Sequence, residues 1–290
     1  MKRVESIEEL RAEVKKLRSE GKTTSFVPTM GCLHDGHVSL MKKGLEIADC
    51  LIVSVYVNPT QFGPDEDFDE YPRQLQADAD VCEKACASLL YTPRDKVMYP
   101  PGFSTFVQEE LLSAPLCGKG RPGHFRGVCT IVTKLLNQVG SDYAVFGQKD
   151  AQQARVIQQI VRDLDIPVKV VLAEISRDED GLARSSRNRY LSSEERDRAL
   201  TLRKCLNAIE TSFLSGERDS SALISIGRKI FQDCSEIELE YLELLDAKSL
   251  QPTHRVENKV LVAVAAIVGP ARLIDNSVLD AELGTIRATL

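Results

Sequence analysis

The pattern of apolar and polar positions alternates between helix-like and strand-like periods along the first 176 residues. Residues 51–57 form a continuous apolar run, which is typical of a parallel strand that helices cover on both faces. Ser6 and Glu9 form a capping-box pattern, which predicts a helix from there to Gly21. The same reasoning predicts further strands at 24–27, 88–91, 103–107, 143–146 and 168–172, and helices at 36–48, 72–87, 127–138 and 150–163.

This alternation predicts an α/β fold with a doubly wound parallel sheet, whose ligands bind beyond the carboxyl ends of the strands. Pro28 is expected to end the first strand. After residue 176 the pattern changes to two long helices, at 193–214 and 219–233, and then to strands at 237–245, 260–268 and 271–274. We therefore expect two domains, at 1–176 and 177–290, of which the second is a smaller α+β domain.

Charge and composition narrow the classes of function. With 37 Lys and Arg against 43 Asp and Glu the net charge is -6, which argues against a nucleic-acid binder because phosphate contacts need clustered basic residues. The charged N-terminus lacks the apolar core of a signal peptide, and no run approaches the ~18 apolar residues of a membrane span. The eight cysteines form no CxxC pair and indicate reduced, mostly buried thiols. We expect a cytoplasmic protein without membrane or nucleic-acid partners.

A histidine pair stands where the first strand passes into its helix. His34 and His37 lie on one face of the predicted first turn, where unpaired backbone N–H groups and the helix dipole favour a phosphate. Each imidazole can donate to the same triphosphate, at about 1.5–3 kcal/mol per charge-assisted bond. Gly36 allows a ligand to approach the backbone. Accidental capping or surface residues are the plainer interpretation, and a zinc site lacks a third ligand at a familiar spacing.

Amide and lysine side chains follow two other strands. Asn58 and Gln61 stand at the end of one strand and suit the hydroxyl and carboxyl oxygens of a small substrate, although an Asn-Pro turn explains them equally well. Lys149 stands near a helix N-terminus, which is unfavourable for a cation unless an anion binds there. Gln153 lies one turn further along. Without a ligand, both would be ordinary surface residues.

Two further segments are rich in basic residues. Residues 117–127 contain the spacing GxGxxG, but Pro115 and Pro122 argue against a dinucleotide fingerprint. A mobile basic loop that closes over an anionic ligand fits better, with a solvated loop as the alternative. Ser185 and Ser186 are flanked by arginines and suit a polyphosphate, although a charged linker has the same composition.

The HxGH spacing after a first strand resembles the signature of the nucleotidyltransferase superfamily, in which adenylate is transferred from ATP. That resemblance implies attack at an α-phosphate. Such attack requires charge stabilisation by His, Lys, Arg and Mg²⁺ rather than a covalent catalyst.

Five segments together resemble the pantothenate synthetase family. They match PTMGxLHxGH, VNPTQF, GHFRGV, FGxKDxQQ and DGLAxSSRNxYLS in the family's order and cover most of residues 1–195. The resemblance implies a Rossmann-like N-terminal domain, a smaller C-terminal α+β lid domain and a cytosolic homodimer. It also implies that the protein uses ATP and Mg²⁺ to join (R)-pantoate to β-alanine through pantoyl adenylate, releasing AMP and pyrophosphate.

The resemblance also implies roles for individual residues. His37 would be a proton donor, and His34, Lys149 and Arg187 would complete the catalytic set. Gln61, Gln153 and Asn58 would bind substrate. The residues lining ATP would be Met30, Gly31, Cys32, Leu33, His34, Asp35, Gly36, His37, Gly147, Gln148, Lys149, Asp150, Ser176, Arg184, Ser185, Ser186 and Arg187. The metal ligands stay undefined, with Asp78 and Asp80 as candidates.

Three positions depart from the family's usual residues. Arg184 replaces a common Met, Ala151 replaces a common aromatic residue, and Gln148 stands where Glu is usual. Arg184 would either add a phosphate contact or disturb the adenine pocket. Two other functions stay open at this point: a nucleotidyltransferase that adenylates another small acceptor, and a nucleotide-sensing module. Gln61 and Gln153 argue against the sensing module.

Overall fold

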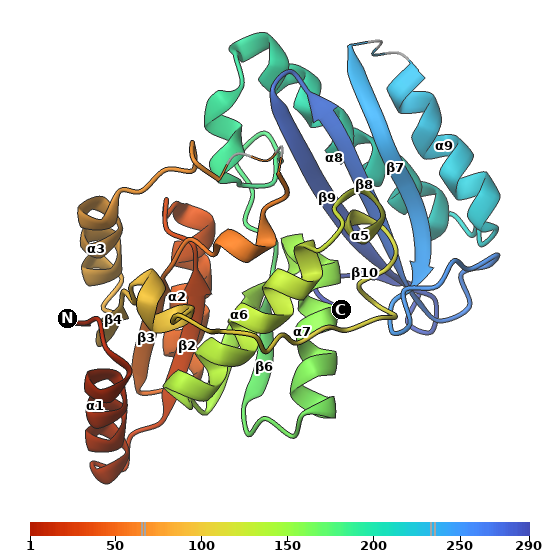
Figure 1. Cartoon of the computed structure of the whole chain (residues 1–290). Helices are drawn as coiled ribbons and strands as arrows, with labels where there is room; N and C mark the ends of the chain where they lie inside the picture. Colours follow the sequence, from red (N-terminus) through yellow and green to blue (C-terminus); the bar gives the residue numbers. More distant parts are fainter. Residues whose placement is uncertain (65, 67, 233, 235) are drawn as a thin grey trace. The chain divides into compact units, whose positions relative to one another are not determined.

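The computed structural model describes all residues except 65, 67, 233 and 235 (Figure 1). The chain divides into two compact units. The N-terminal unit contains Met1–Gly147 and Gln153–Ala173, and the C-terminal unit contains Gln148–Gln152 and Glu174–Leu290. The chain therefore contributes five residues to the C-terminal unit before it completes the N-terminal one.

The N-terminal unit is built on a six-stranded parallel sheet, which confirms the predicted fold class. The strands follow the order β1-β4-β3-β2-β5-β6, so the order reverses between β2 and β5. Such a reversal is the topological switch point at which doubly wound sheets bind ligands. The strands are β1 (Lys2–Val4), β2 (Thr24–Thr29), β3 (Cys50–Val55), β4 (Leu89–Tyr91), β5 (Tyr143–Gly147) and β6 (Lys169–Ala173).

Helices alternate with the strands along the chain and pack on the sheet (Figure 1). Their apolar side chains are buried against it. Met41 of α2 and Cys82 of α3 share a core with Val27 and Val53, while α6 packs on β2 and α1. The capping box at Ser6 is present as predicted. The helices are α1 (Ile7–Ser19), α2 (Asp35–Ile47), α3 (Leu75–Lys84), α4 (Asp95–Met98), α5 (Cys117–Gly120), α6 (His124–Val139) and α7 (Ala151–Asp163).

Two strand predictions were wrong. Pro28 does not end β2, which continues to Thr29. The Thr29 carbonyl accepts from Tyr56 of the β3 side, so the alternating backbone turns Pro28 toward β5, where the pairing has already ended at Phe26. Residues 103–107 form no strand because no neighbouring strand pairs with them. The Val107 amide donates instead to the Thr130 hydroxyl at 3.0 Å.

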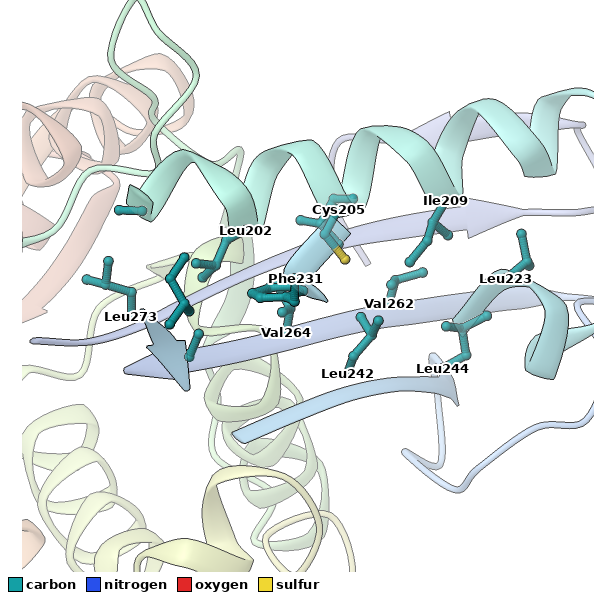
Figure 2. Packing of buried hydrophobic residues seen from close by; sticks show 14 of the residues in the cluster. Leu202, Cys205, Ile209, Leu223, Phe231, Leu242, Leu244, Val262, Val264 and Leu273 are labelled. Carbon is teal, nitrogen blue, oxygen red and sulfur yellow. The ribbon is translucent and has the colours of Figure 1, made fainter. Parts of the chain in front are cut away.

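The C-terminal unit is an antiparallel sheet of order β10-β9-β8-β7, covered by two helices. Figure 2 shows Leu202 and Ile209 of α8 pointing into a core shared with Val262 and Leu244 of the sheet. Each such buried side chain contributes about 1.5–3 kcal/mol by leaving water. The elements are α8 (Ser193–Leu214), α9 (Ser220–Gln232), β7 (Ile237–Asp246), β8 (Lys259–Val268), β9 (Ala271–Asp280) and β10 (Thr285–Arg287). β9 is longer than predicted, and β10 was missed.

Two sequence-based expectations concern the state of the cysteines and membrane-spanning helices. All eight cysteines are free thiols, four of which are buried. Burial raises the pKa of Cys82 and Cys205 to about 12, so these two side chains behave as core residues. Among the residues that the structure describes, no helix combines the length and the apolar character that crossing a bilayer requires.

Candidate active site

The histidine loop follows β2 at the switch point of the parallel sheet. β2 ends at Thr29, and the chain then passes through residues 30–34 into α2. β5, on the other side of the switch point, ends at Gly147. Two segments predicted to line ATP therefore leave the sheet where doubly wound folds bind their ligands.

His34 and His37 cap the helix that they begin. His34 is the N-cap, and its Nδ1 accepts from the Gly36 amide at 3.1 Å. The His34 amide donates to Nδ1 of His37 at 3.3 Å, which completes a reciprocal capping box of two imidazoles. The ring centroids lie 4.2 Å apart with a tilt of 55°. The plain capping interpretation and the functional one thus describe the same geometry.

These capping bonds fix the tautomer of both rings. A nitrogen that accepts from a backbone N–H carries no proton, so these contacts assign the ring proton of each histidine to Nε2. Each ring therefore has an acceptor at Nδ1 and a donor at Nε2. The two rings together place two N–H donors at the N-terminus of α2. Such donors suit an anion or a developing negative charge on phosphate oxygens.

Asp78 of α3 holds the loop that precedes the histidines. Its carboxylate accepts from the amides of Cys32 at 3.2 Å and Leu33 at 2.8 Å, and the side chain is buried. Gly31 has φ +83°, and a Cβ there would lie 2.7 Å from Asp78 Oδ2. Cys32 also adopts a positive φ of 51°. Glycine at 31 is therefore required by both backbone conformation and space.

Gln61 lies beside Met30 and is oriented by Asn58. The Gln61 Nε2 atom is 3.1 Å from Met30 Sδ, and its Oε1 accepts from Asn58 Nδ2 at 3.0 Å. Asn58 is only 1% exposed, so its side chain lies behind Gln61 and away from solvent. Gln153 is half-buried on α7. Met30 and Asp78 also border a cavity of about 470 Å³, which Tyr56 and Arg94 help to line.

In the C-terminal unit, the turn that carries Lys149 rests on Asn276 of β9. Gln148, Lys149 and Asp150 form one turn of 3₁₀ helix. The Asn276 Nδ2 donates to the carbonyls of Gln148 at 3.0 Å and Lys149 at 2.9 Å, while its Oδ1 accepts from Gln148 Nε2 at 2.9 Å. Both amide side chains are buried.

The predicted ATP residues after 173 form a small hairpin. Arg177 and Ala183 pair as an isolated antiparallel bridge, and the Arg184 amide donates to the Ser176 carbonyl at 2.9 Å. The turn therefore brings Ser176 and Arg184 together across eight residues. The Ser185 hydroxyl then accepts from the Arg187 amide at 3.3 Å and caps the following 3₁₀ helix.

Comparison with known proteins decides among the open functions. The model of the family described as pantoate-beta-alanine ligase matches residues 2–278. The chain belongs to this family. The pantothenate synthetase of Thermotoga petrophila is 48% identical over 279 residues, which cover 96% of this chain and all of that relative. The pantothenate synthetase of Geobacter sulfurreducens is 46% identical and covers 97% of this chain and all of its own.

Solved structures of pantothenate synthetases share the fold. That from Thermus thermophilus has a TM-score of 0.90 at 40% identity and covers 95% of this chain and 98% of its own. The pantoate-beta-alanine ligase of Francisella tularensis, complexed with beta-gamma ATP and beta-alanine, has a TM-score of 0.75 at 34% identity over 95% of this chain and 97% of its own. The protein is therefore a pantoate-beta-alanine ligase, which condenses pantoate with β-alanine in an ATP-dependent reaction.

The departures from the usual residues of this ligase family have local partners. Gln148 donates to Asn276, and its Oε1 accepts from the Leu290 amide at 3.0 Å, so both ends of the neutral amide have partners inside the unit. Arg184 donates from Nε to Asp178 at 2.9 Å, and Arg196 holds the same carboxylate at 2.8 Å. Arg184 thus joins an ion-pair network of the hairpin.

The two carboxylates considered as metal candidates make other contacts. Both oxygens of Asp78 accept backbone hydrogen bonds, and the exposed Asp80 accepts from Gln76 at 2.9 Å. Within the described residues, no three His, Cys, Asp or Glu side chains come together as a metal site.

Several supporting residues were not predicted from the sequence. Asp78 was considered only as a metal candidate, and Tyr99 and Asn276 were not singled out at all. His124 was placed in a basic loop, whereas it begins α6 and contacts the Gln61 carbonyl at 2.8 Å. Asp78 and Asn276 are distinguished as buried polar side chains, a feature that only the folded structure shows.

Proposed function

We propose that the reaction proceeds through pantoyl adenylate. The pantoate carboxylate attacks the α-phosphorus of ATP, a bond forms between a carboxylate oxygen and phosphorus, and pyrophosphate leaves. The neutral amine of β-alanine then attacks the acyl carbon and forms a C–N bond. The bond between the acyl carbon and the AMP oxygen breaks, AMP leaves with the former carboxylate oxygen, and the nitrogen releases one proton to solvent. Neither step requires an enzyme nucleophile, so orientation and charge neutralisation supply the catalysis.

The two histidines stabilise the phosphate in this proposal. His34 and His37 each present Nε2–H at the N-terminus of α2, and each donates to an oxygen of the phosphate chain. His37 stands at the family's proton-donor position and donates its Nε2–H as a hydrogen bond, and Lys149 and Arg187 neutralise the remaining charge. The backbone N–H groups that donate to Nδ1 of His34 and of His37, which assign each ring proton to Nε2, are the observation that carries this assignment.

The remaining contacts follow the family resemblance. Gln61 and Gln153 hold pantoate, with Asn58 behind Gln61. ATP is lined by Met30, Gly31, Cys32, Leu33, Asp35, Gly36, Gly147, Gln148, Asp150, Ser176, Arg184, Ser185 and Ser186, in addition to the four catalytic side chains. Mg²⁺ neutralises the triphosphate and is held mainly by its oxygens.

The proposal also covers the role of the C-terminal domain and the oligomeric state. The C-terminal domain, 177–290, acts as a lid that protects the acyl adenylate from water. The enzyme works as a cytoplasmic homodimer, in keeping with its free thiols.

An isotope experiment tests the adenylate. With ¹⁸O in the pantoate carboxylate, complete turnover transfers one labelled oxygen to AMP. Omitting β-alanine leaves pyrophosphate release limited to about one equivalent per site while the adenylate stays bound. Unlabelled AMP, or release of ADP instead, overturns the mechanism.

A further inference from the structure

Gln61 is held by hydrogen bonds at both its side chain and its backbone, all within the N-terminal unit. The Asn58 side chain contacts the Gln61 amide, and His124 contacts the Gln61 carbonyl. Asn58 is the N-cap of the short 3₁₀ turn, η1 (Pro59–Gln61), that carries Gln61, whereas His124 lies 63 residues further along the chain. The orientation of Gln61 is therefore set both by the cap of its own turn and by a residue distant in sequence.

The side-chain contact determines which end of the Gln61 amide is presented to a ligand. Asn58 Nδ2 lies 3.2 Å from the carbonyl of Gly127, which can only accept, so this atom is the amide nitrogen. The same nitrogen faces Gln61 at 3.0 Å, so Gln61 must present Oε1 to it. Gln61 Nε2 then points the other way, toward Met30 Sδ, which is a weak acceptor.

Tyr99 completes this arrangement on the far side of Asn58. Its hydroxyl donates to Asn58 Oδ1 at 2.6 Å, and the Thr60 hydroxyl lies 3.0 Å from the same oxygen. Burial raises the pKa of Tyr99, so the phenol keeps its proton and stays a donor. The Tyr99 ring packs edge-on against Phe103 at 5.0 Å, which fixes the position of the hydroxyl.

The direction of the hydrogen bond between His124 and the Gln61 carbonyl follows from Arg121. Arg121 NH1 lies 3.1 Å from His124 Nε2 and can only donate, so Nε2 carries no proton. His124 therefore donates from Nδ1 to the Gln61 carbonyl at 2.8 Å. Arg121 is itself held by both oxygens of Glu66, at 2.7 and 2.5 Å.

We propose that Tyr99 and His124 are positioning residues that present the Gln61 Nε2–H donor to an oxygen of pantoate. Tyr99 acts through the Asn58 amide, and His124 acts on the backbone of the same residue. An oxygen acceptor of the substrate replaces the weak contact with Met30. This inference rests on the proposed role of Gln61 in binding pantoate, and it explains the presence of a histidine and an arginine in the 117–127 segment without a direct ligand contact.

A double-mutant cycle tests the role of Tyr99. Tyr99→Phe retains the ring and removes only the hydroxyl, so we expect the KM for pantoate to rise about 2- to 10-fold while the KM for ATP is unchanged. In a Gln61→Ala background the same change has no further effect, because the group that it positions is gone. An equal effect in both backgrounds, or no effect in the wild type, overturns the proposal.

A conservative variant tests His124. Asn places an N–H donor near the position of Nδ1, so His124→Asn retains most of the pantoate affinity that His124→Ala loses. Equal pantoate KM values for the two variants contradict the backbone role. Failure of the proposed function gives a different result: Gln61→Ala would then leave the pantoate KM unchanged, whatever Tyr99 and His124 do.

Discussion

Replacement of His34 separates its capping role from its chemical role. His34→Ala removes both the Nδ1 acceptor of the N-cap and the Nε2–H donor. His34→Asn retains an acceptor at the N-cap, where Asn is among the preferred residues, but has no group in place of Nε2. The N-cap lies outside the helix proper, so differences in helix propensity between Ala and Asn have little influence on the comparison.

The two effects have different expected sizes. Loss of an N-cap costs about 0.5–2 kcal/mol, so the Ala variant should unfold roughly 2–4 °C below the Asn variant for each kcal/mol lost. Loss of one charge-assisted hydrogen bond to phosphate costs about 1.5–3 kcal/mol, which lowers the rate of adenylate formation about 10- to 150-fold in both variants. Activity should therefore fall in both, and stability only in one.

Far-UV circular dichroism measures the melting temperature, and pyrophosphate release with ATP and pantoate alone measures adenylate formation. Near-normal adenylate formation in His34→Asn would refute the phosphate contact. Equal melting temperatures of the Ala and Asn variants would refute the capping contribution. Because the readouts are independent, either part of the reasoning can fail alone.

Three further predictions address the supports of the site. In Gly127→Ala the new Cβ would lie 2.2 Å from the Thr60 carbonyl oxygen. We therefore expect the free energy of unfolding, measured by chemical denaturation, to fall by about 1–3 kcal/mol and the pantoate KM to rise. Gly120→Ala, which has open space around its Cβ, should match the wild type. Burial raises the pKa of Glu66, but the hydrogen bonds and charge of Arg121 outweigh burial and hold that pKa below 4.5. The wild type should therefore be more stable than Glu66→Gln above about pH 5, and this advantage should disappear as the pH falls through the lowered pKa. Thermal melts at several pH values measure the difference. Asn276→Asp turns a carboxylate toward the Gln148 and Lys149 carbonyls, so steady-state kinetics should show at least a tenfold loss of kcat/KM for ATP. The hydroxyl of the adjacent Ser277 makes no hydrogen bond within the described residues, so Ser277→Ala should show no such loss.

Local signals explain which elements could be predicted from the sequence. The capping box at Ser6 and the apolar run of β3 are decided by neighbouring residues, and both were confirmed. β1 was missed because it has three residues, and its pairing with β4 joins Arg3 to Leu90. The segment 103–107 has the composition of a strand, but a strand forms only where another strand offers hydrogen bonds.

In the candidate site, too, some residues could be predicted from the sequence and others could not. Motif spacing identified the residues that are proposed to face ligands, since residue type and position along a strand end carry that information. Their supports are distant in sequence: Tyr99 lies 41 residues from Asn58, Asp78 lies 46 from Cys32, and Asn276 lies 128 from Gln148. No local pattern links such pairs, because only the folded sheet brings them together.

The supports share a physical reason for being polar. Apolar packing is not directional, so it can bury Gln61 or the turn of Lys149 without deciding which way an amide or a backbone carbonyl points. A buried hydrogen bond does decide this, since leaving one partner unsatisfied costs about 1–3 kcal/mol. Asn58, Asp78 and Asn276 are all buried and each makes at least two such bonds. Substitutions at these residues should therefore change KM and kcat, and they should also cost about 1–3 kcal/mol of stability for each buried partner that is left unsatisfied.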